Sequence, residues 1–159
     1  CAVVSIDSLL SRPEWKVSER TVSLLLKLRA LSQKSYIVQT RKGDQSIIED
    51  ALKGNIADFY RNEIALRHTL GYPPFTVLIK LSIVGSLARG EAEMQKLLDY
   101  LEPFGIEGYP EPIHLGRGRF GFNALIRVAR ESWPDPTLVA RLRALPPYVA
   151  VDVNPENLI

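Results

Sequence analysis

The chain has 159 residues, of which 46% are hydrophobic and 24% are charged, which is enough for one good core or a small core with an appended piece. Its formal net charge of +2 is too small to indicate nucleic-acid binding by itself. The charge is uneven, with 11 Lys and Arg against 8 Asp and Glu in residues 1–70, and 9 against 10 in residues 71–159. We therefore expect any contact with a polyanion to be local.

The composition also limits the chemistry of the chain. Cys1 is the single cysteine, so the chain alone can form neither a disulfide framework nor a zinc site of thiolates. His68 and His114 lie far apart in the sequence and outside any cluster with metal-ligand spacing, so we predict no metal site. No apolar stretch approaches the ~20 residues of a membrane span, and no signal peptide is visible. We expect no membrane partner and a cytoplasmic location.

Residues 1–45 have the pattern of a strand, a helix and a second strand. Apolar runs at residues 2–7 and 36–39 predict the strands, and the apolar spacing within residues 18–31 predicts the helix. Such units form parallel sheets, which need cover on both faces and neighbours along their edges. Two strands cannot meet this need, and the chain begins at Cys1 directly before an apolar run. We therefore expect residues 1–45 to be the end of a larger lobe.

Two helices are predicted within residues 46–70. The first ends at Gly54, and the second carries Glu63 and Arg67 at the i,i+4 spacing of an ion pair. Gly71 and the two prolines that follow it stop the second helix, so we place a domain boundary after residue 70. The apolar stripe predicted for the second helix consists of Ile56, Phe59, Tyr60 and Ile64.

From Phe75 onward the hydrophobic pattern has a period of two, which predicts a strand with one buried face. Helix, strand, strand, helix and strand patterns follow. This order is typical of a ferredoxin-like sandwich, in which two helices cover one face of a sheet and the other face is open. We therefore predict an α/β (α+β) fold that ends in a βαββαβ domain. Its predicted elements are a strand at 76–83, a helix at 91–101, strands at 106–109 and 119–128, a helix at 137–144 and a strand at 148–153.

The predicted strand at residues 119–128 presents different side chains on its two faces. Arg119, Asn123 and Arg127 share one parity and should line the open face, where Lys80 and Asp152 should join them. Guanidinium groups beside an amide suit a phosphate or a chain-terminal carboxylate, which Arg holds through two parallel hydrogen bonds. The other interpretation, more common for such a pattern alone, is the solvated face of an amphipathic strand. The residues of opposite parity, which should pack on the helices, are Phe120, Phe122, Ala124, Ile126 and Val128.

The segment before this strand is basic and rich in glycine. Arg117 lies between Gly116 and Gly118, and glycine lets the backbone come close to a ligand. Contact of Arg117 and Gly118 with a nucleic-acid backbone is one interpretation, and a plain surface hairpin is the other. The residue types do not separate the two.

Residues 50–75 carry the most specific signal in the chain. They include the block Leu70-Gly71-Tyr72-Pro73-Pro74-Phe75, and further matches follow at Arg117-Gly118-Arg119-Phe120 and Val151-Asp152-Val153-Asn154-Pro155. On these residues nearly the whole chain resembles the C-terminal end of the primosomal replication-restart DNA helicases, the PriA family. Other residues that carry the resemblance are Ala51, Leu52, Gly54, Phe59, Tyr60, Glu63 and Arg67.

The resemblance implies an organisation for the chain. Residues 1–45 would be the C-terminal remnant of the second RecA-like helicase lobe, residues 46–70 a helical connector, and residues 71–159 a C-terminal ferredoxin-like domain. The Leu70–Phe75 block would serve as a helix stop and an extended link into the first strand.

The resemblance also implies a function in DNA replication restart. The chain would bind forked or single-stranded DNA, single-stranded-DNA-binding protein and other primosome proteins. In the family, an Arg and an amide residue of the strand at 119–128 help to form a pocket for the acidic C-terminal tail of single-stranded-DNA-binding protein. Arg119 and Asn123 fall on those positions, with Asn where Gln is also found. Arg127 matches no motif of the family.

The same resemblance argues against ATP hydrolysis by this chain. The family has a Gln-x-x-Gly-Arg-x-Gly-Arg motif whose last Arg reaches the γ-phosphate of ATP. Here residues 25–32 keep Arg29 on the position of the first Arg, and Ser32 stands where the last Arg would be. The Gly-rich phosphate loop, the acidic magnesium site and the zinc-binding region are not in this sequence. We expect no catalytic residue and no ATP, Mg²⁺ or Zn²⁺ bound by this chain, although the family uses all three.

Two other functions stay open from the sequence. One is a piece of an active ATP-dependent 3′ to 5′ DNA helicase, which an upstream phosphate loop and a cysteine-rich zinc region would favour. The other is a ferredoxin-like module that binds RNA or a peptide on its open face. Binding assays with forked DNA, single-stranded RNA and an acidic tail peptide would separate these functions.

Overall fold

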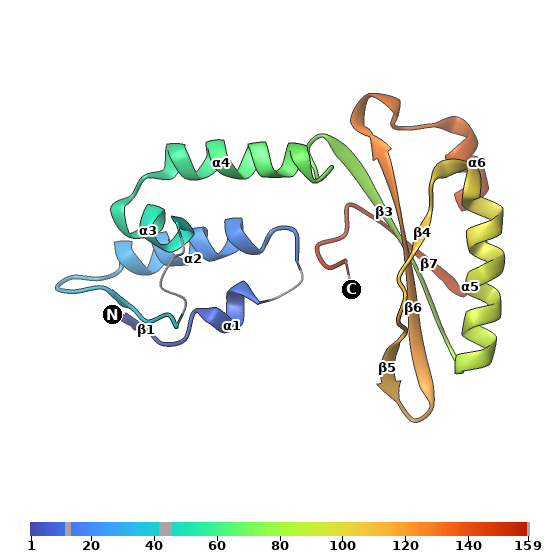
Figure 1. The fold of residues 1–159 in the computed structure, drawn as a ribbon, viewed down its shortest axis with the longest axis horizontal. Helices are drawn as coiled ribbons and strands as arrows, with labels where there is room; N and C mark the ends of the chain where they lie inside the picture. Colours follow the sequence, from blue (N-terminus) through green and yellow to red (C-terminus); the bar gives the residue numbers. More distant parts are fainter. Residues whose placement is uncertain (12–13, 42–45, 159) are drawn as a thin grey trace. The chain divides into compact units, whose positions relative to one another are not determined.

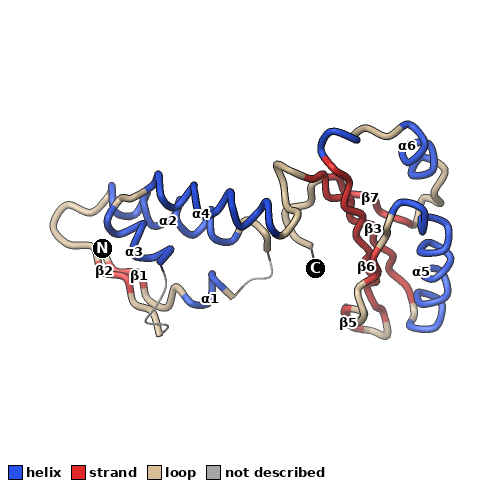
Figure 2. The backbone as a smooth tube through the Cα atoms, turned by 45° about the horizontal axis from the view of Figure 1, so that its top comes forward, coloured by secondary structure: helices blue, strands red, loops and turns tan. Residues whose placement is uncertain are grey.

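The computed structural model describes residues 1–11, 14–41 and 46–158. The chain divides into two compact units, Cys1–Leu70 and Gly71–Ile159, each with its own hydrophobic core. Both units combine helices with strands, which confirms the mixed composition predicted from the sequence (Figures 1 and 2). Within the described ranges, no helix has both the length and the apolar character that crossing a membrane requires.

The first unit combines helices that pack on one another with a two-stranded parallel sheet. β1 and β2 pair with Ala2 opposite Ile37 and Val3 opposite Val38. Residues from both sides of position 45 form its core, so the helices of residues 46–70 pack with the residues before them. The core consists of Ile6, Val22, Leu25, Ile48, Ala51 and Phe59. The elements are β1 (Ala2–Val3), α1 (Asp7–Leu10), α2 (Val17–Ala30), β2 (Ile37–Val38), α3 (Ser46–Lys53) and α4 (Ile56–Thr69).

β1 is shorter than the predicted strand, because the backbone leaves the extended region at Ser5, where φ is 62°. Asp7 then begins α1, a helix that the apolar pattern did not predict. The Asp7 carboxylate accepts hydrogen bonds from Thr40 Oγ1 at 2.7 Å and from the Arg41 backbone N–H at 3.0 Å. These bonds tie the segment after β1 to the segment after β2.

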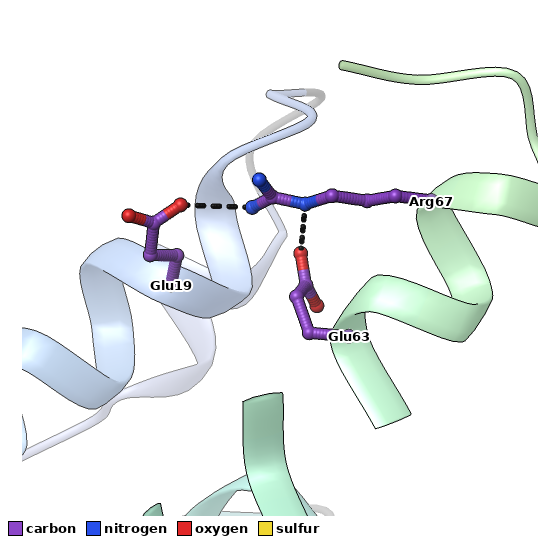
Figure 3. A network of polar contacts seen from close by, with 3 residues as sticks. All are labelled: Glu19, Glu63 and Arg67. Atoms are coloured by element: carbon purple, nitrogen blue, oxygen red, sulfur yellow. Dashed lines mark hydrogen bonds and ion pairs between the residues drawn. The ribbon is translucent and has the colours of Figure 1, made fainter. Parts of the chain in front are cut away.

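Arg67 joins α4 to α2 through two carboxylates (Figure 3). Its Nε donates to Glu63 Oε1 and its Nη2 donates to Glu19 Oε2, both at 2.8 Å. Only 12% of the Arg67 side chain and 10% of the Glu63 side chain are exposed. Burial lowers the pKa of Arg67, but the hydrogen bonds to Glu19 and Glu63 raise this pKa by more. The predicted Glu63–Arg67 pair is confirmed, and Glu19 is an additional partner.

The predicted apolar stripe of α4 is only partly buried within the first unit. Phe59 is 4% exposed and belongs to the core, whereas Ile56, Tyr60 and Ile64 are 43%, 55% and 43% exposed. The expectation that these four residues pack as one stripe is therefore wrong. The reason is that α4 turns the side with Phe59 and Glu63, rather than the side with Tyr60, toward α2 and α3.

The second unit is an antiparallel sheet with α5 and α6 on one face (Figures 1 and 2). The strand order is β4-β6-β3-β7, and β5 pairs with β6. The longest ladder joins β3 to β6, from Thr76 opposite Ala129 to Gly85 opposite Phe120. The elements are β3 (Thr76–Gly85), α5 (Leu87–Leu101), β4 (Glu107–Gly108), β5 (Ile113–Gly116), β6 (Arg119–Ala129), α6 (Pro136–Arg143) and β7 (Val149–Val153), with short 3-10 helices η1 (Glu102–Phe104) and η2 (Arg130–Ser132).

The helix side of this sheet carries the core of the second unit. Alternate residues of β3 and β6 point into it, as the period of two predicts. The parity predicted for residues 119–128 is confirmed, because the even-numbered residues of β6 pack on the helices. The buried core consists of Val77, Ile79, Leu81, Ile83, Met94, Leu97, Leu101, Phe122, Ala124, Ile126 and Leu138.

α5 begins at Leu87, four residues before the predicted start at Glu91. Gly90 lies inside the helix, where the sequence pattern treats glycine as a break. It is buried, and a Cβ atom built on it would lie 1.9 Å from Phe122 Cε2. The helix can approach β6 at this point only because residue 90 has no side chain.

Candidate functional site

The candidate site is the face of the sheet in the second unit that lies opposite α5 and α6, here called the open face. Arg119, Asn123 and Arg127 lie on it, because their parity on β6 is opposite to that of the core residues. Lys80 joins them through its register with Leu125 on β6 and Asp152 on β7.

Arg119 lies at the first position of β6, directly after a tight turn. Its side chain is exposed, and the described part of the chain offers it no hydrogen bond or ion pair. A guanidinium without an internal partner keeps all its donors for a ligand, and two of them can bind one carboxylate side by side.

Asn123 lies four residues further along the same face, about 13 Å from Arg119 at the rise of a strand. It is half-buried, and its Oδ1 accepts a hydrogen bond from Ser82 Oγ at 2.8 Å. Its backbone carbonyl accepts from the Tyr109 N–H at 2.9 Å. The amide oxygen is therefore already used as an acceptor, whereas the Nδ2 group, the only donor of the side chain, can donate to a ligand.

The surface between Arg119 and Asn123 is apolar. Gly121 lies between them on β6, and a Cβ atom built on it would lie 3.5 Å from Leu115 Cδ1 of β5. Both Leu115 and Val84 are well exposed, at 54% and 46%. Along the open face, a charged group, an apolar surface and an amide group therefore follow one another.

β5 is a strand of the second unit that the apolar pattern did not predict. It pairs with β6, with Ile113 opposite Gly121 and His114 opposite Phe120, and a bulge follows His114. The turn to β6 places Arg117 at φ 52° and Gly118 at φ 69°, the two positive angles of a type I′ hairpin turn. The Gly-Arg-Gly-Arg segment was the signal for this hairpin, because glycine favours that turn. Arg117 is exposed at its tip.

Arg127 is on the open face but already has a carboxylate partner. Its Nη1 donates to Glu107 Oε2 on the neighbouring strand β4. Tyr109 lies near this pair, and burial raises the pKa of its hydroxyl. Since the charge of Arg127 is compensated, Arg127 is less suited to bind an anion than Arg119.

Lys80 is covered by the chain itself. Its Nζ donates to the backbone carbonyl of Asn157 at 3.3 Å, and burial lowers the pKa of Lys80 while Asp152 opposes this shift. After β7, Asn154 pairs with both backbone groups of Leu78, and the next residues turn onto the open face.

The expectation that the whole second face is open is therefore wrong. Leu78 and Leu125 belong to that face, yet they are only 0% and 2% exposed, and Leu158 at the chain end is 7% exposed. The C-terminal segment, residues 154–158, covers the part of the face around Lys80. The part with Arg119, Leu115 and Asn123 stays accessible.

Arg29, which the sequence resemblance places on the first Arg of the helicase motif, is in the first unit. It lies in the last turn of α2, and a Cβ atom built on Gly54 would lie 2.8 Å from its Nη1. Gly54 directly follows α3, so the Arg29 guanidinium is next to the carbonyl end of that helix, where a cation is favourable. No group of His, Cys, Asp and Glu residues in the described ranges could hold a metal ion.

No protein-family model matches the chain. Individual proteins do match, and each of the following is named replication restart protein PriA. The chain is 26% identical to the one from Thermotoga maritima over 98% of its own length and 22% of that protein. It is 24% identical to the one from Haemophilus influenzae over 99% of the chain and 24% of that protein. A shorter match to the one from Chlamydia muridarum reaches 34% identity over 54% of the chain and 12% of that protein.

These matches confirm the resemblance to the replication-restart family over nearly the whole chain. The chain spans about a quarter or less of the length of these relatives.

Proposed function

We propose that the chain acts in DNA replication restart as a docking module for forked or single-stranded DNA and for the acidic C-terminal tail of single-stranded-DNA-binding protein. The position of Arg119 is the observation that supports this proposal. Arg119 lies exposed on the open face, on the same side of β6 as Asn123, in a chain similar to replication restart proteins.

The arrangement suits a peptide that ends in a carboxylate. Arg119 can bind the two terminal oxygens in parallel, and Asn123 can donate to a backbone carbonyl further along the peptide. The apolar surface formed by Leu115 and Val84 between them can contact an apolar side chain of the tail. Other primosome proteins are further proposed partners, for which we assign no residue.

The DNA contact is proposed for the tip of the β5–β6 hairpin. Arg117 is exposed there, and Gly118 lets the backbone come close to a phosphate. Two arginines within one turn give a local positive charge on a unit whose net charge is otherwise slightly negative. Phosphate binding of this kind is independent of base sequence.

We also propose the finer fold assignments. The strand order β4-β6-β3-β7, with α5 and α6 on one face, supports a ferredoxin-like domain for residues 71–159. The parallel pair of β1 and β2 supports a remnant of a RecA-like lobe for residues 1–45. Residues 46–70 would connect the two.

The proposed module has no ATPase activity and binds no ATP, Mg²⁺ or Zn²⁺ of its own. The residues present do not fit these groups: the sequence has no phosphate loop, and Arg29 lies against the end of α3. The alternative is a piece of an active helicase, which would need a phosphate loop that residues 1–159 do not contain. Release of phosphate from ATP by the purified chain, in the presence of DNA, would contradict the proposal.

The binding proposal is tested with a labelled tail peptide and two variants. Arg119→Ala should weaken peptide binding by about 1–3 kcal/mol, because a charge-assisted hydrogen-bond pair is lost. Arg127→Ala is the matched control, since that guanidinium is already paired with Glu107, and it should change affinity little. Equal affinity of Arg119→Ala and the unchanged chain would contradict the proposed pocket.

A further inference from the structure

A hollow lies on the helix side of the sheet in the second unit, between α5 and the segment that joins α6 to β7. Its volume is about 320 Å³, which is within the range of pockets that hold small ligands or the anchoring side chain of a peptide. Leu97, Leu145 and Val149 supply its apolar lining. This groove, here called the α5 groove, shares no residue with the open face.

Two tyrosines with large exposed surfaces flank the α5 groove. Tyr100 is 41% exposed and Tyr148 is 47% exposed. Both are held in place: the Tyr148 hydroxyl donates to Glu93 Oε2 at 2.7 Å, and the Arg141 guanidinium lies 5.1 Å from the centre of the Tyr100 ring. Rings that are fixed before binding lose little entropy on contact, and exposed aromatic residues are typical anchors of interfaces.

The rim of the α5 groove has an excess of positive charge. Glu93 is compensated, since its carboxylate accepts from Tyr148 and from Lys96 Nζ at 2.9 Å. Arg89 lies one turn before Glu93 on α5, and Arg141 lies at the Tyr100 end. The lining itself holds the paired Glu93 and Lys96, and Arg89 and Arg141 lie beside it, while Asp99 precedes Tyr100 on α5. The three cations thus outnumber the two carboxylates, which favours a negatively charged ligand.

We propose that the α5 groove docks an acidic segment of a protein partner, which inserts one large apolar side chain between Tyr100 and Tyr148. The apolar lining accounts for the inserted side chain, and Arg89, Lys96 and Arg141 account for the acidic flanks. This site is separate from the proposed pocket at Arg119, and neither depends on the other.

The test uses the whole chain and an amidated, acetylated peptide of sequence Asp-Glu-Asp-Leu-Phe-Glu-Asp-Glu as the probe. Titration by NMR should shift the signals of Leu97, Tyr100 and Tyr148. Lys96→Glu should weaken binding about tenfold, because it reverses a rim charge. The Lys96 side chain is 71% exposed, so this variant should keep the fold. Arg61→Glu on α4 changes the net charge equally and should leave the affinity unchanged.

Three results would overturn the proposal. The first is equal binding of a peptide with Ala-Ala in place of Leu-Phe, which would mean that only charge is recognised. The second is a set of shifts around Arg119 instead of Tyr148, and the third is a stronger shift of the same groove signals by a single-stranded oligonucleotide. Arg119→Ala should leave binding of the amidated probe unchanged, which distinguishes failure of this site from failure of the proposed function.

Discussion

At the scale of single residues, the contact with Phe122, rather than helix propensity, requires glycine at position 90. Alanine at this position would improve helix propensity by about 0.5–1 kcal/mol, but its Cβ would overlap the Phe122 ring. We therefore expect Gly90→Ala to lower the free energy of unfolding of the second unit by about 2 kcal/mol, because overpacking outweighs propensity. Urea denaturation followed by the fluorescence of Trp133, in a Trp15→Phe background, measures the change.

A double-mutant cycle identifies the cause. Phe122→Leu in the Gly90→Ala background should recover part of the lost stability, although Phe122→Leu alone destabilises the core. Strictly additive effects of the two changes would show that the ring contact is not the reason.

At Tyr36, a single buried oxygen atom lowers the stability of the first unit. The Tyr36 hydroxyl is the single buried side-chain polar atom in the described residues that has no hydrogen-bond partner, and burial raises the pKa of Tyr36. Tyr36→Phe removes this atom and should raise stability by about 1 kcal/mol. Tyr148→Phe is the matched control, because its hydroxyl is bonded to Glu93, and it should not stabilise. A clear loss of stability in Tyr36→Phe would contradict this interpretation.

At the scale of elements, the packing of α4 on α2 depends on Arg67. Arg67→Gln leaves the Glu63 carboxylate nearly buried without a cation, so we expect a loss of about 2–3 kcal/mol in the first unit. Arg61→Gln, on the same helix, breaks an exposed pair with Asp58 and should cost under about 0.5 kcal/mol. Hydrogen exchange of the amides of α2 and α4 measures both changes. Similar protection in the two variants would mean that Arg67 does not hold these helices together.

The hydrogen bonds between the segments after β1 and β2 predict that the stability of the first unit depends on pH. Hydrogen bonds from Thr40 and the Arg41 N–H lower the pKa of Asp7 below its ordinary value. A lowered folded-state pKa adds stability at pH above the unfolded-state value, about 3.9, and this stability is lost as pH falls through the folded-state pKa. Asp7→Asn should therefore be less stable than the unchanged chain at neutral pH, with a difference that narrows below about pH 4. A difference that stays constant down to pH 2 would contradict this role.

At the scale of the whole molecule, much of the fold follows from sequence periodicity. The helices and strands of both units lie close to their predicted positions where apolar residues repeat regularly, as in β3 and β6. The errors fall where tertiary contacts decide. α5 includes Gly90 because Phe122 requires a residue without a side chain there, and α4 exposes Tyr60 because Arg67 and Phe59 set its rotation.

The candidate site was predicted less completely than the fold. The period of two placed Arg119 and Asn123 on one face, but periodicity cannot say which side chains find partners. Glu107 pairs with Arg127 across a strand contact between residues 20 positions apart in the sequence. The C-terminal segment covers Lys80 through a hydrogen bond to Asn157, which is 77 positions away in the sequence. In the structure Arg127 is paired with Glu107, whereas Arg119 has no side-chain hydrogen bond or ion pair among the described residues.

The central claim is that Arg119 on the open face binds a chain-terminal carboxylate. The most direct measurement compares two forms of the acidic tail peptide of single-stranded-DNA-binding protein, one with a free C-terminus and one amidated, by isothermal titration of the whole chain and of Arg119→Ala. The free acid should bind the unchanged chain more tightly than the amide, and this preference should vanish in Arg119→Ala. A preference of equal size in both proteins, or equal binding of the two peptides to the unchanged chain, would contradict the claim.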